Sequence, residues 1–427
     1  MNDKLNRREF IAGSVAGMAG LAWGCSGAGS APAGRVGEPV SLGRPDAGVA
    51  TLASRAEKAF RSASDRELPL IEVAGSPREI GRAIGKRFGR EIKTGLERRA
   101  EWFSELEEYA AGEEGRSAME DFRAAARKHT PRAVEELEGW AEGAGIEAER
   151  LWVLNLKAEI RALIDRREEK EGKGGQPGCS TVVVAEPGRV RHLHNEDGHE
   201  AYADSMFLVR ARPTDGAEYF CLSYPGILPG NAPAINEHGV VQTTNFIYTK
   251  EVRRGVGRYF LDRMILESRD LAEALEWSSH PERAYAFHHV LTSVPEKRAV
   301  GIEVTPSKKK VHEIDGLYLH TNHLVLEGMA DEEQDPDYVG SSSSSRWKVL
   351  EKWAAGADDP AALSDEELLA PLASHESAPY SPCRHPAGDV EGFTLATAFF
   401  EAPSGSLRLY KGQPCRGIHA EYRAFPH

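Results

Sequence analysis

The sequence of 427 residues lacks the features of several common protein classes. It has no apolar run of about 18 residues, so we expect no membrane-spanning helix in the mature protein. Its formal net charge of −13 argues against binding nucleic acid, because a phosphate backbone needs clustered Lys and Arg. It also has no Gly-x-Ser-x-Gly elbow and no phosphate-binding glycine loop, which argues against serine esterase and nucleotide chemistry.

Cysteine is scarce, with only five residues in the chain. An odd, sparse set of cysteines is not a disulfide framework. Cys383 and Cys415 could pair with each other, and Cys25 could carry a lipid. Cys179 and Cys221 then remain as candidates for thiol chemistry.

The first 35 residues indicate an export signal rather than part of the fold. Arg7 and Arg8 precede an apolar stretch that is too short to span a bilayer, which resembles a twin-arginine signal. An ordinary Sec signal is the alternative. Cys25 resembles a lipoprotein attachment site, whereas Ala31-Pro32-Ala33 offers cleavage to a soluble form. Periplasmic, extracellular and lipid-anchored locations therefore all stay open.

After a linker at residues 36–67, the pattern from 68 to 178 is helical. Ser76-Pro77-Arg78-Glu79 predicts a helix start, with a cap, a proline in the first turn and a glutamate three residues on. Apolar residues then recur at every fourth position, from Ile80 to Ile92, and give one buried face. Residues 166–177 are charged and then glycine-rich, which predicts an exposed loop.

From Cys179 onward the pattern changes to short strands separated by turns, with a few helices between them. Strands are predicted at 180–185, 189–195, 206–210, 218–223, 240–246, 299–304, 317–320, 394–400 and 406–410, and helices at 259–269, 271–278 and 346–353. The serine run at 341–345 predicts a mobile loop. This order favours a layered α+β fold over a doubly wound parallel sheet.

The junction between Gly178 and Cys179 suits a chain that cuts itself. A cysteine that attacks the carbonyl before it is least hindered when the preceding residue is glycine. Hydrolysis of the resulting thioester would leave a free α-amine on Cys179. With an ordinary pKa of about 7.7–8.0, that amine can act as a base near neutral pH, so one residue supplies both nucleophile and base. A small buried core cysteine is the alternative interpretation.

Several short motifs, in the same order over roughly residues 70–420, resemble the isopenicillin N acyltransferase-like family (acyl-coenzyme A:6-aminopenicillanic acid acyltransferase). That family belongs to the N-terminal-nucleophile hydrolases and is similar to the choloylglycine hydrolases. The motifs are Glu135-Glu136-Leu137-Glu138-Gly139-Trp140-Ala141-Glu142-Gly143-Ala144-Gly145, Leu154-Asn155, Gly178-Cys179-Ser180-Thr181, His194-Asn195-Glu196-Asp197, Pro225-Gly226, Asn236-Glu237-His238-Gly239, Thr321-Asn322-His323, Ser345-Arg346 and Gly412-Gln413-Pro414-Cys415.

The resemblance implies roles for five residues. Cys179 would be the nucleophile and Asp197 the carboxylate that holds its α-ammonium. Asn322 and Asn245 would donate to the oxyanion, and Arg346 would reach the site from a following helix. A turn aspartate, a strand-end asparagine and a solvent-facing arginine are the plain alternatives for Asp197, Asn245 and Arg346.

The resemblance also implies a four-layer αββα sandwich. Residues 68–178 would be an α-chain that stays packed on a catalytic β-chain at 179–427. The expected substrate is an amide or thioester of a small acyl compound. Either water or an amine would be the final acceptor of the acyl group. No cofactor is expected.

One departure from the family concerns His194, which stands where the family commonly has arginine. An arginine would lower the pKa of a nearby thiol without titrating, whereas a histidine is only partly charged at neutral pH. The substrate contacts of this position, and bile-salt-type specificity with them, are therefore in doubt. The nucleophile itself is unaffected, because Cys179 would carry its own base.

Two other functions compete with this interpretation. A zinc hydrolase could use His192, His194 and His199, although no His-Glu-x-x-His motif and no second cysteine near Cys179 support it. An exported binding protein could retain the fold and have lost turnover. Chain cleavage at Gly178 would discriminate between the binding protein and the enzyme.

Overall fold

The computed structural model describes residues 67–168, 178–330, 332, 334, 339–387, 390 and 392–425. The predicted export signal and nearly all of the predicted linker lie outside these residues. Within them, no helix is both long and apolar enough to cross a membrane.

The described chain opens with strand β1 (Leu70–Gly75) and six consecutive helices. The helices are α2 (Pro77–Arg98), α3 (Ala100–Ala111), α4 (Glu113–His129), α5 (Pro131–Ala144), α6 (Ala148–Asn155) and α7 (Lys157–Glu168). Ser76 caps α2 with a full capping box, and the predicted apolar face from Ile80 to Ile92 is buried. The predicted helical segment is confirmed from Pro77 to Glu168, whereas Leu70–Gly75 forms a strand instead. The expected loop from residue 166 is wrong for its first three residues, because α7 continues to Glu168.

Helices α2 and α5 lie unusually close because glycines face each other along their contact. A Cβ atom built on Gly81 would lie 2.0 Å from the carbonyl oxygen of Glu136, and one on Gly139 would lie 2.2 Å from that of Arg78. Any larger side chain at these positions would force the helices apart. This close contact explains why glycines occur inside α2 and α5, although glycine within a helix lowers stability.

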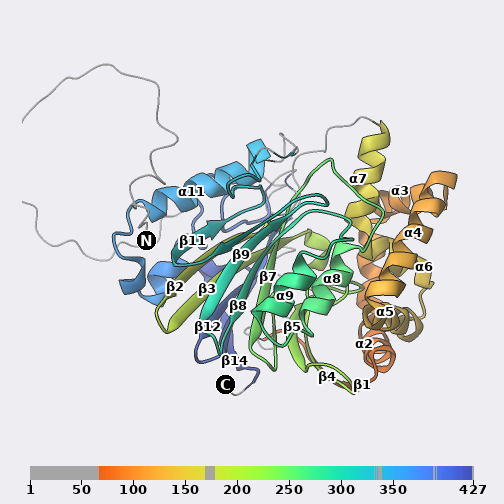
Figure 1. The fold of residues 1–427 in the computed structure, drawn as a ribbon, viewed down its shortest axis with the longest axis horizontal. Coiled ribbons are helices and arrows are strands. Elements are labelled where there is room, and N and C mark those ends of the chain that lie inside the picture. The colour runs from red at the N-terminus through yellow and green to blue at the C-terminus, as the bar shows by residue number, and fades with distance from the viewer. Residues whose placement is uncertain are drawn as a thin grey trace, which may run out of the picture. The chain divides into compact units, whose positions relative to one another are not determined.

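The remaining strands form two sheets (Figure 1). The eight-stranded sheet has the order β1-β4-β5-β6-β7-β8-β9-β10, and the six-stranded sheet has the order β11-β2-β3-β12-β13-β14. All neighbouring strands run antiparallel except β1 and β4, which are parallel. The strands are β2 (Ser180–Glu186), β3 (Arg189–Gly198), β4 (Phe207–Pro213), β5 (Tyr219–Ser223), β6 (Ala234–Asn236), β7 (Val240–Phe246), β8 (Phe287–Ser293), β9 (Arg298–Val304), β10 (Lys309–Glu313), β11 (Gly316–His320), β12 (Phe393–Ala402), β13 (Ser406–Lys411) and β14 (His419–Arg423).

The fold is therefore α+β, and the predicted strands from 180 to 410 are confirmed in place and type. The two sheets meet face to face, since His192 of β3 contacts Thr243 of β7 and Thr292 of β8 through its two ring nitrogens at 2.8 and 3.1 Å. Helices α8 (Arg258–Ile265) and α9 (Leu271–Ser278) match two predicted helices, and α9 packs on β8 and β9. Figure 1 shows α11 (Ser344–Ala354) beside β11, away from α8 and α9.

The serine run is not the mobile loop that its composition predicts. Residues Val339–Ser343 form a short π-helical turn that leads into α11, and Ser342 and Ser343 are buried. The hydroxyl of Ser343 accepts a hydrogen bond of 2.7 Å from the backbone N–H of Asn322. Serine fits here because a small polar side chain can be buried where the start of a helix meets another loop, provided that its hydroxyl is bonded.

Candidate active site

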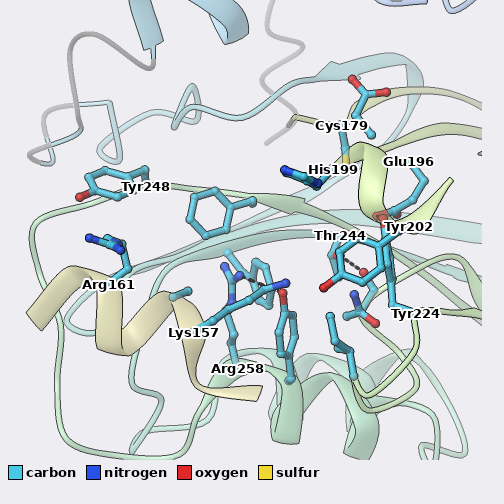
Figure 2. Close-up of a pocket in the computed structure, with 18 of the residues that line it drawn as sticks. Lys157, Arg161, Cys179, Glu196, His199, Tyr202, Tyr224, Thr244, Tyr248 and Arg258 are labelled. Atoms are coloured by element: carbon cyan, nitrogen blue, oxygen red, sulfur yellow. Dashed lines mark hydrogen bonds between the residues drawn. The ribbon is translucent and has the colours of Figure 1, made fainter. Parts of the chain in front are cut away.

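Cys179 lies directly before β2, at the end of a pocket. Both Gly178 and Cys179 are buried. In the β2–β3 pair Ser180 is opposite Asn195, so the hairpin brings Glu196 and Asp197 across from Cys179. Figure 2 shows Cys179 and Glu196 at the same side of the pocket. The resemblance predicted this meeting of Cys179 and Asp197, and both residues line the pocket.

The pocket encloses about 160 Å³ and is lined by aromatic rings and basic groups. This volume is close to that of a cavity that holds benzene, about 150 Å³. The lining side chains include aromatic Trp102, Tyr202, Tyr224, Phe246, Tyr248, Tyr259 and Phe287 and basic Arg99, Lys157, Arg161 and Arg258. Figure 2 shows Lys157 and Arg258 on the side of the pocket away from Cys179. The pocket can therefore bury a small apolar or aromatic group with an anionic substituent near the basic side.

Asp197 is the second-last residue of β3 and is almost completely buried. Its Oδ1 accepts a hydrogen bond of 2.7 Å from the Thr394 hydroxyl of β12, whereas its Oδ2 has no hydrogen-bond partner among the described residues. Burial raises the pKa of Asp197 to about 7, although the charges of Arg384 and Arg346 oppose this shift. The carboxyl group can therefore gain or lose a proton near neutral pH and still has one oxygen available for a donor.

Glu196 is the second buried carboxyl group beside Cys179. Burial raises its pKa to about 8, against the opposing hydrogen bond of 2.6 Å from the hydroxyl of Tyr224. His194 lies next to it, with Nε2 3.4 Å from Oε2 of Glu196, and burial lowers the pKa of His194 to about 3. Near pH 7 both groups are neutral, so His194 gives the thiol no positive charge and does not replace the family's arginine.

The environment of Cys179 keeps its sulfur protonated in the uncut chain. Burial, together with the nearby carboxyl groups of Glu196 and Asp197, raises the pKa of the Cys179 thiol well above its usual range. The backbone N–H of Asp197 opposes this shift by donating toward the sulfur. A base must therefore take the thiol proton before the sulfur can attack a carbonyl group.

Arg346 contacts the backbone of Cys179, the candidate nucleophile, and does not line the pocket. It is buried in α11 and donates from Nη1 to the carbonyl oxygen of Cys179 and to Ser180 Oγ. Its Nη2 donates to Oδ1 of Asn322 at 2.8 Å. The Nδ2 of Asn322 in turn donates to the carbonyl oxygen of Phe246 at 2.8 Å. These bonds fix the Cys179 backbone and leave Asn322 with one further N–H to offer.

Asn245 points between the two sheets. Its Oδ1 accepts from Thr181 Oγ1 at 3.0 Å and lies 2.9 Å from Nδ1 of His288, while its buried Nδ2 has no hydrogen-bond partner among the described residues. The neighbouring Thr244 and Phe246 line the pocket, whereas Asn245 and Asn322 do not. The oxyanion roles of the two asparagines stay predictions.

The three histidines of the zinc alternative do not converge. In the described part of the chain, no group able to hold a metal combines two of them. His192 uses both ring nitrogens on threonines, and Nδ1 of His199 accepts from the backbone N–H of Ala201. His194 does lie with Cys179 and Glu196, but these are the candidate nucleophile and its neighbour.

Comparison with known proteins identifies the family of this chain. Residues 184–416 match the model of the family described as acyl-coenzyme A:6-aminopenicillanic acid acyl-transferase, which is more than half of the chain. The chain belongs to this acyl-transferase family. The matched range begins just after Cys179, so it includes Asp197, Asn245, Asn322 and Arg346 but not the nucleophile candidate itself.

Among relatives of this acyl-transferase family member is the beta-alanyl-dopamine/carcinine hydrolase of Drosophila melanogaster. The two are 24% identical over 369 residues, which cover 81% of this chain and 93% of the relative. Similar solved structures include a mutant of the conjugated bile acid hydrolase of Clostridium perfringens (13% identity, 54% of this chain and 89% of that one, TM-score 0.35). Another is the penicillin V acylase of Agrobacterium tumefaciens (9% identity, 55% and 82%, TM-score 0.33).

Most of the groups that shape the pocket around Cys179 were not predicted from the sequence. Glu196 was visible only as part of a motif, and Tyr224, Lys157 and Arg258 gave no signal, because they come together from α7, α8 and a loop far apart in sequence. The same holds for Thr394, which reaches Asp197 only through the pairing of β12 with β3.

Proposed function

We propose that this protein is a self-processing cysteine N-terminal-nucleophile hydrolase that cleaves the amide of a small acyl compound. The observation that carries the proposal is that Cys179 and Asp197 line one pocket, where the β2–β3 hairpin, with Ser180 paired to Asn195, brings them near each other. Family membership and the hydrolase among the relatives support an amide as the bond that is cut.

The first step would be cleavage of the chain itself. The Cys179 sulfur attacks the carbonyl carbon of Gly178, the C–N bond to Cys179 breaks, and the thiol proton passes to the departing α-nitrogen. Water then hydrolyses the thioester, which leaves the Gly178 carboxyl group and the restored thiol. The new α-ammonium offers a donor near the free Oδ2 of Asp197.

The same groups would then act on a substrate. The α-amine of Cys179 takes the thiol proton, the sulfur attacks the acyl carbonyl carbon, and the resulting ammonium returns its proton to the leaving amine. Water hydrolyses the acyl thioester. Arg346 holds the Cys179 carbonyl oxygen throughout, and a further N–H of Asn322 and the Nδ2 of Asn245 are the candidate oxyanion donors.

The lining of the pocket supports a small acyl compound, with a ring or chain among the aromatic side chains and an anionic group near Lys157 and Arg258. A free Lys157 amine has little tendency to be charged there, because burial and the charges of Arg99 and Arg258 lower its pKa well below the usual value. A bound anion would favour its protonation. Acyl transfer to an amine is the second candidate, and the family description favours it.

The proposed arrangement of the fold is the four-layer αββα sandwich, with the two sheets between helical layers. Contacts of α9 with β8 and β9, and of α11 with β11, support helices on the outer faces. After cleavage we expect the segment up to Gly178 to stay packed on the catalytic segment, since α5 contacts α8 and α2 contacts β4.

Intact mass of the purified protein tests the proposal. We expect two chains, and the larger should begin with free Cys179 and weigh about 27 kDa as its share of the 46.7 kDa whole. Cys179→Ala should remain one chain. A screen of N-acyl amino acids, penicillins and acyl thioesters should then find turnover in the wild type only. A wild-type protein that is active while still uncut at Gly178 would refute the mechanism, and an uncut protein with no turnover would favour the binding-protein alternative.

We also propose export by the twin-arginine route, which carries folded proteins and so permits cleavage before transport. The supporting feature is Arg7-Arg8 ahead of a short apolar stretch. Replacing both arginines by lysine should leave the protein inside the cell, measured by fractionation and immunoblot. Unchanged secretion would indicate a Sec signal, and labelling with a radioactive fatty acid would tell lipid anchoring at Cys25 from soluble release.

A further inference from the structure

A second group of reactive side chains lies outside the pocket. It consists of two cysteines and two histidines, called here the Cys2His2 cluster: His375, Cys383, His385 and Cys415. One ligand atom of each residue lies within 4.8 Å of the others. The mechanism proposed above uses none of the four side chains.

The distances in the Cys2His2 cluster are close to those of a tetrahedral metal site. Zinc bonds of about 2.0–2.3 Å to nitrogen and sulfur place the ligand atoms of a tetrahedron about 3.3–3.8 Å apart. Nε2 of His385 lies 3.1 Å from Nε2 of His375, 3.3 Å from Sγ of Cys415 and 3.6 Å from Sγ of Cys383. All four ligand atoms thus converge on a volume that one ion would fill.

The chemistry of the donors points to the same ion. We propose that the Cys2His2 cluster binds one zinc ion as a structural site. Two thiolates and two neutral imidazoles form a common structural zinc set and balance the charge of the ion. Both cysteines are present as free thiols rather than as a disulfide. The exposure of His375 and Cys415 leaves the ion a route from solvent.

The location gives the site a structural purpose. Described residues between α12 (Asp365–Leu369) and β12 form turns and bends but no helix or regular strand. Three ligands lie in this irregular segment, and Cys415 lies in the η4 turn (Pro414–Arg416) between β13 and β14. A bound ion would therefore attach this segment to the six-stranded sheet, to which no regular strand pairing joins it among the described residues.

The tied segment is also close to the pocket. Between Cys383 and His385, the backbone N–H of Arg384 donates to Thr394 Oγ1 at 3.0 Å, and Thr394 Oγ1 donates to Asp197 at 2.7 Å. The carbonyl oxygen of Pro382 accepts from Asn195 at 2.9 Å. Zinc would thus act as a support for the strand end that carries Asp197, two hydrogen bonds away.

Metal analysis of the whole protein tests the proposal. The wild type, produced with zinc in the medium and purified without chelator, should carry about one zinc per chain after dialysis. His375→Ala and Cys415→Ser should each reduce zinc to background. The matched control is His312→Ala, since His312 is an exposed histidine on β10 away from the cluster, and Cys221→Ala controls for thiol number. Both controls should keep the zinc.

Cobalt replacement gives a second readout that does not depend on activity. Cobalt in a tetrahedral site with thiolate ligands should show strong visible absorption and a sulfur-to-metal charge-transfer band. Cys415→Ser should lose the charge-transfer band in part or entirely, while wild type that has been cut and uncut Cys179→Ala should both show it. This last comparison separates the zinc proposal from the proposed function, because Cys179→Ala removes the hydrolase but not the cluster.

Three results would overturn the proposal. The first is a protein with no metal whose cysteine thiols are free. The second is a mass lower by two hydrogens with Cys383 and Cys415 joined in a disulfide. The third is zinc that remains in His375→Ala and Cys415→Ser at the wild-type level, which would mean that it binds elsewhere.

Discussion

Two cysteines of this protein, Cys179 and Cys415, differ in every respect that controls thiol chemistry. Cys179 is buried at the start of a strand and faces carboxyl groups, and these surroundings raise the pKa of its thiol well above the usual value. Cys415 is exposed in a short turn. The Cys383 thiol and the imidazoles of His385 and His375 donate toward its sulfur and lower its pKa to about 4.

The difference indicates two separate uses of the same side chain. A thiolate that a neighbouring thiol and two imidazoles stabilise in an exposed turn is ready to bind a metal without further activation. A thiol held neutral in a pocket attacks a carbonyl group only as its proton is taken up by another group. In the proposed self-cleavage that group is the departing nitrogen, and the α-amine that cleavage releases would then serve as the base for attack on substrates. Burial would thus protect the proposed nucleophile, whereas exposure would serve the proposed metal site.

The sharpest way to break this comparison is to remove each cysteine in turn. Cys179→Ala should remain uncut and lose all turnover, a loss on the order of 10⁶ as for other deleted nucleophiles. Cys415→Ser should lose zinc and yet still cut itself. Intact mass, zinc content and substrate turnover are measured on both variants. Turnover by Cys179→Ala, or an uncut Cys415→Ser that keeps its zinc, would show that the two roles are assigned to the wrong residues.

Much of the fold could be predicted from local patterns, and the exceptions have a physical cause. Strand β8 escaped prediction because all of its residues are buried, the polar ones as well as the apolar ones. His288 and His289 are fully enclosed, and they bond Tyr318 and Asp262 at 2.8 Å each. A strand that buries histidines beside apolar residues shows no alternation of polar and apolar side chains to detect. The buried serines before α11 were misread as a loop for the same reason.

The candidate site also contains some residues that could be predicted from local sequence and others that could not. Cys179 and Asp197 could be proposed from motifs, because the hairpin that brings them together is local in sequence. The raised pKa of Glu196 and the Cys2His2 cluster could not, since both depend on burial or on pairing between distant segments. No spacing in the sequence indicates that residues 383 and 415 meet at the end of the six-stranded sheet.

A smaller effect is expected at Asn322, which sharpens the account of the Cys179 pocket. Asn322→Ala should lower turnover on the order of 10²–10³, as for loss of one oxyanion donor. Asn322→Asp keeps the oxygen that Arg346 contacts but loses the N–H donors, so it should be as slow as the alanine variant. Rates are measured per mole of cut enzyme. A fast Asn322→Asp enzyme would mean that Asn322 acts through Arg346, and the oxyanion donor would then be sought at Asn245.

The smallest effect concerns the carboxyl groups that set Cys179 apart from Cys415. The pKa of Glu196 is raised in the folded state from 4.5 to about 8, so the folded protein binds a proton that the unfolded chain has already released. This contribution to stability is complete below about pH 4.5 and is lost as the pH rises through 8, at up to about 1.4 kcal/mol per pH unit. Asp197 contributes in the same direction only up to about pH 7.

Between pH 7 and 8, Glu196 should therefore account for most of the pH dependence that these two groups contribute to the free energy of unfolding. Glu196→Gln keeps an oxygen for the Tyr224 hydroxyl but cannot ionise, so its free energy of unfolding should fall less steeply over this interval than that of the parent. Urea unfolding is best measured in the Cys179→Ala background, where both proteins are expected to be single chains. Parallel curves for the two proteins would show that Glu196 is already ionised at pH 7. The Cys179 thiol would then face a negative charge, and its own base would have to overcome a larger barrier than burial alone imposes.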